Sequence, residues 1–134
     1  MASIRKEITV AANAEQVWDA VRDIGALHTR LAPGFVVDTR LEAGARIVTF
    51  GNGAVARELI VTIDDADRRL VWSVVGGHLT HHNASAQVFD DGDDHCRFVW
   101  IADVLPDDAA ASIGTMMEQG LRVIRATLER QTAA

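Results

Sequence analysis

Three histidines lie close together in the segment VVGGHLTHHN, residues 74–83. His78, His81 and His82 carry imidazole groups, which bind metals or transfer protons near neutral pH. Adjacent residues on a strand point to opposite faces, so His81 and His82 cannot readily share one ion. A zinc site also needs further matched ligands. The histidines are therefore interpreted first as solvated loop residues, second as contacts at the rim of a pocket, and only third as a metal site.

Other residue types that often carry chemistry indicate no particular reaction. Cys96 is the only cysteine, so an internal disulfide is excluded. The acidic run DDGDD at 90–94 is predicted to form a hairpin turn, because the spacing and the closing Glu of a calcium loop are missing. The sequence contains no phosphate-binding loop and no recognisable nucleophile motif. We expect neither a metal nor a cofactor.

The composition is that of an ordinary globular domain. The chain has 134 residues, of which 49% are hydrophobic and 24% charged, and we expect one domain over 1–134. A net charge of −6 argues against nucleic acid and anionic membranes as partners. No apolar run approaches the roughly 20 residues of a membrane helix. The first residues, MASIRKEITV, lack the apolar segment of a signal peptide, so we expect a cytoplasmic protein.

Hydrophobic periodicity predicts one strand, two short helices, six strands and one long helix. The first strand covers 4–10, and Asn13 is a favoured N-cap for a helix over 13–24. A short second helix is expected to end near Leu31, before Pro33-Gly34. The six strands are expected at 35–42, 45–51, 55–64, 69–76, 80–89 and 95–105. Short Gly- and Asp-rich turns between them imply an antiparallel meander.

The last helix is predicted to run from Pro106 to about Arg130. One apolar stripe follows it, formed by Ile113, Met116, Met117, Gly120, Leu121, Ile124 and Leu128. A single long helix that packs against a strongly curved sheet must fill the curve or leave a cavity. The elements therefore indicate an α+β fold in which the interior is either solid or hollow.

The order of these elements and three stretches resemble the START-like, or SRPBCC, superfamily, which includes polyketide cyclases. The stretches are VWDAVRDIGAL at 17–27, the block 44–77, and FVWIADVLPDD followed by EQGLRVI at 118–124. The resemblance implies a helix-grip fold, in which a curved antiparallel sheet of about seven strands wraps around the C-terminal helix. Two short helices would lie between the first and second strands. The stretches are specific for the fold and not for a reaction.

The block 44–77 also resembles the plant abscisic acid receptors, in which a gate loop and a latch loop close over an apolar acid. The gate corresponds to residues 51–54, and the latch to His78-Leu79-Thr80. Gly76-Gly77 would let the chain turn sharply at the pocket mouth. Both loop sequences differ from those of the receptors. The resemblance therefore implies a lidded pocket rather than hormone sensing.

The resemblance also implies which side chains line the pocket. They are Arg46, Val48, Phe50, Glu58, Ile60, Trp72, Val74, Ala84, Ala86, Trp100, Ser112, Met116 and Gly120. A pocket of this kind binds apolar or aromatic molecules, and a few polar groups fix their orientation. Glu58 is the best catalytic candidate, because a carboxylate in an apolar site can exchange a proton unless a cation offsets the effect. A structural ion pair with Arg46 is the alternative.

The two faces of the strand at 55–64 are ambiguous. Its periodicity favours a buried face of Val55, Leu59, Val61 and Ile63. The resemblance instead turns inward Glu58, Ile60 and Thr62. Both assignments hold if the resemblance gives the inner face and a partner covers the outer face of the sheet. We therefore expect a homodimer in which Leu59 and Val61 pack against a second copy, since a contiguous apolar patch marks an interface.

Two classes of function follow. The first is a protein that carries or senses a small apolar molecule, acting through a protein partner if it is a sensor. The second is an enzyme of the polyketide cyclase or dehydratase kind, which directs a reaction by pocket shape and acid–base assistance. A co-chaperone or toxin-like member of the same fold is a third class. A Glu58 free in a cavity of several hundred Å³ would keep catalysis open, whereas a paired and enclosed Glu58 would exclude it as the catalyst.

Overall fold

The structure is a computed structural model that describes residues 1–132. Its strands are β1 (Ala2–Val10), β2 (Val36–Glu42), β3 (Ala45–Phe50), β4 (Val55–Asp64), β5 (Arg69–Val75), β6 (His81–Gly92) and β7 (His95–Leu105). Its helices are α1 (Ala14–Arg22), η1 (Ile24–Ala26), η2 (Leu27–Leu31), η3 (Asp107–Ala109) and α2 (Ala110–Thr132). Positions 133 and 134 of the predicted domain lie outside the described residues.

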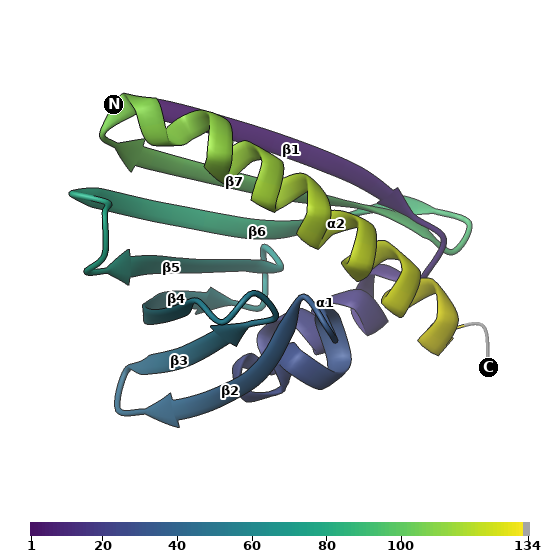
Figure 1. Cartoon of the computed structure of the whole chain (residues 1–134). Helices are drawn as coiled ribbons and strands as arrows, with labels where there is room; N and C mark the ends of the chain where they lie inside the picture. The colour runs from purple at the N-terminus through teal and green to yellow at the C-terminus, as the bar shows by residue number, and fades with distance from the viewer. Residues whose placement is uncertain (133–134) are drawn as a thin grey trace.

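All seven strands form one antiparallel sheet in the order β1-β7-β6-β5-β4-β3-β2. The sheet curls so that its concave face surrounds one side of α2, while α1 lies beside the C-terminal half of that helix (Figure 1). This arrangement confirms the predicted α+β class, the number of strands and the meander. The structure adds that the two strands farthest apart in the sheet, β1 and β2, are consecutive in the chain. The segment containing α1, η1 and η2 therefore spans the open side of the curve.

The first helix starts where the sequence predicts. The side-chain oxygen of Asn13 accepts hydrogen bonds from the backbone nitrogens of Glu15, at 2.9 Å, and Gln16, at 3.4 Å. These bonds satisfy two N–H groups that a helix start leaves free. The helix ends at Arg22, two residues before the predicted boundary, because Asp23 leaves the helical conformation with φ −79° and ψ 74°.

The hairpin between β6 and β7 is longer than predicted. β6 continues past residue 89 to Gly92, which pairs with His95. Asp93 and Asp94 form the turn with φ values of 52° and 57°. Two positive φ values suit a two-residue turn that matches the twist of the strands. The acidic run at 90–94 is thus a hairpin turn, as the sequence predicts.

A bulge in β4 settles which of its residues face inward. Glu58 and Ile60 lie opposite Val74 and Trp72 on β5, and the register then shifts before Thr62. The extra residue, Val61, is 58% exposed, and the shift returns Ile63 to the core side. A bulge reverses the alternation of a strand by one residue. Periodicity was therefore wrong for the exposed Val55 and Val61, and the resemblance was wrong for the exposed Thr62.

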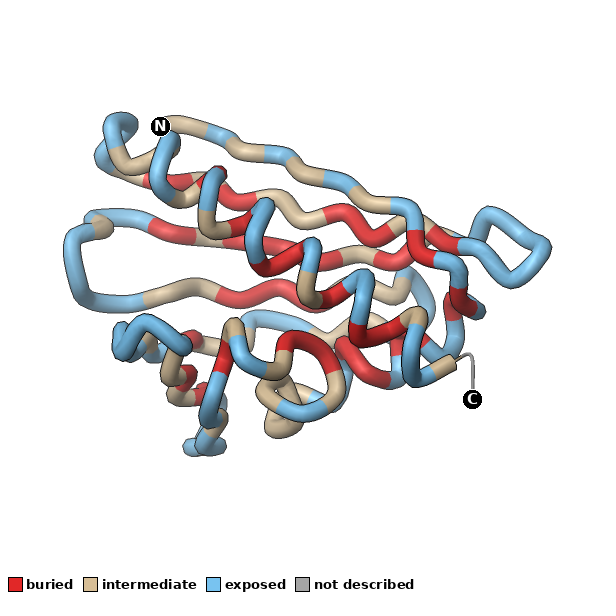
Figure 2. The backbone as a smooth tube through the Cα atoms, turned by 45° about the vertical axis from the view of Figure 1, so that its right-hand side comes forward, coloured by how far each residue is buried: buried red, intermediate tan, exposed pale blue. Residues whose placement is uncertain are grey.

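The long helix α2 packs one face against the concave side of the sheet. Its buried residues are Gly114, Met117, Gly120, Leu121, Ile124, Thr127 and Leu128. Figure 2 shows buried positions, in red, along the inner side of α2 and in the middle of the strands. Ile113 and Met116 in the first half of the helix are only partly buried. The predicted stripe is confirmed, and its loosest part lies near the start of α2.

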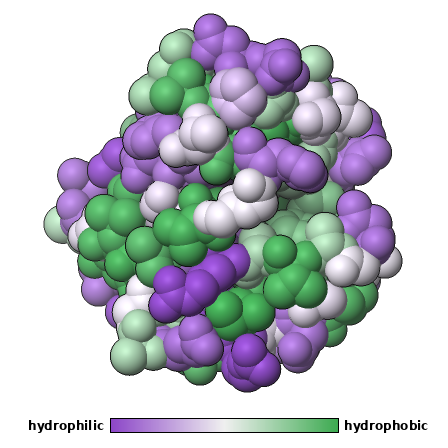
Figure 3. Space-filling view, turned by 60° about the vertical axis from the view of Figure 1, so that its left-hand side comes forward, coloured by the Kyte–Doolittle hydropathy of each residue, from purple (hydrophilic) through white to green (hydrophobic). Residues whose placement is uncertain are grey.

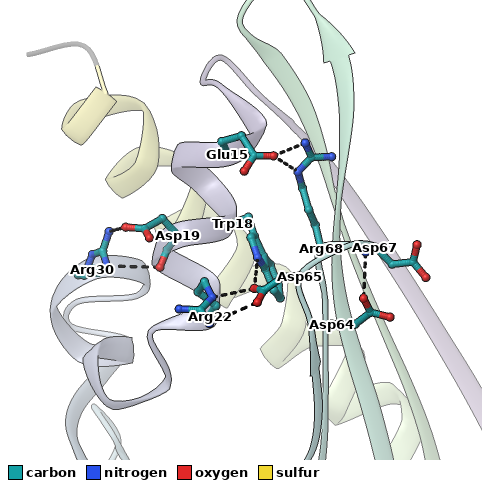
Figure 4. A network of polar contacts seen from close by, with 9 residues as sticks. All are labelled: Glu15, Trp18, Asp19, Arg22, Arg30, Asp64, Asp65, Asp67 and Arg68. Carbon is teal, nitrogen blue, oxygen red and sulfur yellow. Dashed lines mark hydrogen bonds and ion pairs between the residues drawn. The ribbon is translucent and has the colours of Figure 1, made fainter.

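Polar contacts hold α1 and η2 in place beside the sheet (Figure 4). Asp65, in the turn between β4 and β5, accepts hydrogen bonds from Arg22 Nε at 2.8 Å and Trp18 Nε1 at 2.9 Å. The bond from Arg22, and then that from Trp18, hold the pKa of Asp65 below its ordinary value. Arg30 Nη2 donates to Asp19 at 2.7 Å and so links η2 to α1. The network fixes the segment that crosses the open side of the curve.

Candidate ligand-binding cavity

A cavity of about 190 Å³ lies between the concave face of the sheet, α2 and the segment that crosses the open side. Figure 3 shows a hollow among apolar and polar groups at the end of the molecule that carries the β5–β6 loop. Among residues 1–132, the cavity lining includes three charged or titratable side chains, those of Arg46, Glu58 and His82. The remaining lining is apolar, which suits an apolar guest.

Most of the predicted pocket residues line this cavity. They are Arg46, Phe50, Glu58, Trp72, Val74, Ala86, Trp100 and Met116. They come from five strands and from α2, so only the folded sheet brings them together. The predicted latch also reaches the cavity, because Leu79 lines it while His78 is exposed. Gly76 and Gly77 have φ values of 86° and 72°, which give the sharp turn expected at this point.

Five predicted pocket residues lie elsewhere. Val48 and Ala84 are 0% and 1% exposed and belong to the packed core, which Ile60 also contacts. Ser112 faces a separate outer groove. A side-chain atom added at Gly120 would lie 3.1 Å from Phe35 and 3.2 Å from Trp100. The absence of a side chain at Gly120 therefore seats these two rings against α2 and adds no free space.

More than half of the described lining residues were not predicted. The largest group follows α1 and includes Leu27, Leu31, Ala32, Phe35 and Val36. Their apolar character was visible in the sequence, but no periodic pattern shows which cavity an irregular segment will close. A pocket-rim contact is the second interpretation of His82 from the sequence, and the predicted site does not include it. It is 8% exposed and lines the cavity.

Arg46 and Glu58 form an ion pair in the cavity wall. They lie opposite each other on β3 and β4, and Arg46 Nε donates to Glu58 Oε1 at 2.8 Å. The residues are 4% and 6% exposed. Arg46 Nη1 also donates to the carbonyl oxygen of Ile24 at 3.3 Å, and its guanidinium lies 5.8 Å from the centre of the Trp72 ring. The pair thus joins the sheet to η1 while it contributes polar groups to the cavity.

An outer groove of about 650 Å³ adjoins the cavity. Phe35, Phe50 and Met116 line both spaces. The two phenylalanine rings meet edge to face, with their centres 5.6 Å apart. The predicted gate residues Gly51, Asn52 and Ala54 line the outer groove, together with Ser112, Thr115 and Gln119 of α2. The groove therefore places polar side chains, such as those of Asn52 and Gln119, next to the apolar rings that it shares with the cavity.

Two further findings concern metals and membranes. Within the described part of the chain, no three His, Cys, Asp or Glu side chains converge in a way that could hold a metal ion. His81 is exposed and His82 is buried, as expected for neighbours on a strand. Among residues 1–132, no helix combines the length and the apolar character needed to span a bilayer.

Comparison with known proteins places the chain in a family. A family model described as "Polyketide cyclase / dehydrase and lipid transport" matches residues 1–130. The chain belongs to this family. No curated protein sequence matches it. Membership of the polyketide cyclase, dehydrase and lipid transport family agrees with a cavity that has an apolar lining.

Solved structures with the same fold come from varied organisms. One from Thermobifida fusca, determined by solution NMR, is 27% identical, with a TM-score of 0.79 and coverage of 98% of this chain and 93% of that chain. A START superfamily protein from Mycobacterium smegmatis is 16% identical, with a TM-score of 0.72 and coverage of 98% and 97%. Norcoclaurine synthase from Thalictrum flavum, in complex with dopamine and hydroxybenzaldehyde, is 19% identical, with a TM-score of 0.72 and coverage of 97% and 85%. These likenesses confirm the helix-grip fold of the START superfamily.

Proposed function

We propose that this member of the polyketide cyclase, dehydrase and lipid transport family binds a small hydrophobic or aromatic molecule between the sheet and α2. The proposal rests on the apolar lining of a cavity of about 190 Å³. Drug-sized ligands occupy roughly 300–1,000 Å³, whereas an apolar cavity of about 150 Å³ takes up benzene. The ligand is therefore a compound of one or two rings, or an aliphatic molecule of similar volume.

The state of Glu58 favours binding over catalysis by this residue. Glu58 lines the cavity, so it is not closed off from a ligand, but it is paired with Arg46, so it is not a free carboxylate. Glu58 Oε1 is already occupied by Arg46 Nε, and the residue is 6% exposed, so a ligand meets an ion pair rather than a free carboxylate. We therefore assign the protein as a carrier or sensor, in which Arg46 and Glu58 shape and orient the site.

Freshly purified protein is expected to retain a small apolar molecule. Native mass spectrometry should detect a species heavier than the 14.5 kDa chain, and the added mass should disappear on denaturation. Protein stripped of this molecule should bind indane, with NMR shift changes at cavity residues such as Ala86 and Met116. Native protein without added mass, together with unchanged spectra in saturating indane, would contradict the proposed function.

We also propose that a second copy covers the outer face of β4. Val55 and Val61 are 64% and 58% exposed there, and Leu59 is half-buried beside them. Exposed apolar residues on one sheet face favour association. Light scattering after size-exclusion chromatography is expected to give twice the mass of one chain. Val61→Lys should give monomers, whereas Val37→Lys, on β2, should not; a monomeric wild-type protein would refute the dimer.

A further inference from the structure

His82 is held on the concave face of the sheet at one side of the cavity. It shares this face with Ala84 and Ala86, whereas His81 faces the other side and is exposed. His82 lies opposite Val104 on β7 and lines the cavity. Its position in β6 makes it a fixed part of the sheet rather than part of the turn around Gly76-Gly77. A ligand in the cavity therefore meets this imidazole in one defined orientation.

A backbone contact determines which imidazole nitrogen carries the proton. The ladder between β5 and β6 ends at the pair Trp72 and Ala84. Beyond it, the backbone nitrogen of Val74 donates to His82 Nδ1 at 3.0 Å, and Ser73 Oγ donates to the carbonyl oxygen of His82. A backbone N–H can only donate, so Nδ1 must be the acceptor. In the neutral ring, the proton then lies on Nε2.

The Nε2–H group of His82 is free to donate to a ligand. Within residues 1–132, Nε2 makes no hydrogen bond. Nε2 is also not fully enclosed. The fully enclosed side-chain atoms that lack a partner include Trp100 Nε1 but not His82 Nε2. Burial, followed by the nearby charge of His81, lowers the pKa of His82, so the ring is neutral at pH 7. His82 thus offers the cavity a neutral donor that keeps accessible surface.

The charges in the cavity wall select against an ionic ligand. Arg46 and Glu58 are the charged residues among the described lining residues, and each is the other's partner. An ionised ligand would lose its hydration and find no unpaired charge of opposite sign. A neutral molecule with an acceptor atom incurs a much smaller cost, and His82 Nε2–H can offset it.

We propose that the cavity takes a neutral compound of one or two rings that carries a carbonyl or similar acceptor, and that His82 Nε2–H donates to this acceptor. The inference rests on the proposed function and adds the polar group of the ligand. His82 is then a specificity-determining residue. It is held by one ring nitrogen and recognises the ligand through the other.

Two probes and two variants test this assignment. 1-Indanone and indane have nearly the same shape and differ by one carbonyl group. In His82→Asn, the amide oxygen replaces Nδ1 as the acceptor for Val74, while the amide nitrogen takes the place of ring atom Cδ2 and does not reach the position of the Nε2 donor. Calorimetry should show an affinity for 1-indanone that is about 5–10-fold lower than in the wild type, with a change of less than about twofold for indane. His81→Asn, the same substitution on the exposed face, should change neither affinity.

¹⁵N NMR tests the tautomer of His82, first without ligand and then with each probe. ¹⁵N NMR of the ligand-free protein should show that His82 carries its proton on Nε2, and the Nε2 signal should shift with 1-indanone but not with indane. A proton on Nδ1, or equal losses of affinity for both probes in His82→Asn, would overturn the assignment. Failure of the wild type to bind either probe would instead refute the proposed function, while the tautomer result would stand separately.

Discussion

Glu58→Leu alone is expected to lower the free energy of unfolding by about 3–5 kcal/mol, because it leaves the charge of Arg46 buried without its partner. Arg46 is 4% exposed, and its second contact, with the carbonyl oxygen of Ile24, does not balance a charge. Arg46→Met should have a similar effect by leaving Glu58 unpaired. Chemical denaturation followed by circular dichroism would measure both losses.

The double variant Arg46→Met/Glu58→Leu should recover most of that stability. Replacement of a buried ion pair by apolar residues of similar volume is often neutral or stabilising. A residual loss of about 1 kcal/mol is expected from the hydrogen bond to Ile24. If the double variant lost as much as the two single variants combined, the two residues would not act as a pair. The cavity wall would then need another explanation.

Ala86→Phe is expected to abolish binding of indane while the protein stays folded and as stable as the wild type or more so. Ala86 lines the cavity and lies opposite Leu70 on β5 and Trp100 on β7. A phenyl group at this position would occupy the space meant for the ligand, and added apolar burial favours the folded state. Calorimetric titration and thermal denaturation would measure the two effects.

Ala84→Phe is the matched control, since it makes the same change two residues earlier on the same face of β6. Ala84 is 1% exposed and does not line the cavity. Added volume in a packed core costs about 1–3 kcal/mol or more. We therefore expect Ala84→Phe to lower the melting temperature and Ala86→Phe not to. Equal destabilisation by both would mean that the interior is solid at Ala86, and the binding proposal would fail.

The amino-acid sequence determined the features that depend on neighbouring residues. Asn13 starts α1, the paired glycines at 76 and 77 make a turn, and the acidic run at 90–94 makes a hairpin. Alternation and turn residues placed the strands to within a few residues, since these signals depend on residues that are close together in the sequence. The resemblance supplied the curved sheet and eight of the 21 described residues that line the cavity, including Glu58 and Ala86.

The tertiary structure alone decided which strand faces are buried and which spaces in the interior are filled. The bulge at Val61 reverses which side chains in the rest of β4 face the core, and no local sequence pattern predicts a bulge. Phe35 and Trp100 fill the space over Gly120, which the resemblance places in the pocket lining. Burial of His82, and with it a fixed donor at the cavity, depends on where the β5–β6 ladder ends. Each outcome follows from packing between segments distant in sequence, which local propensity cannot encode.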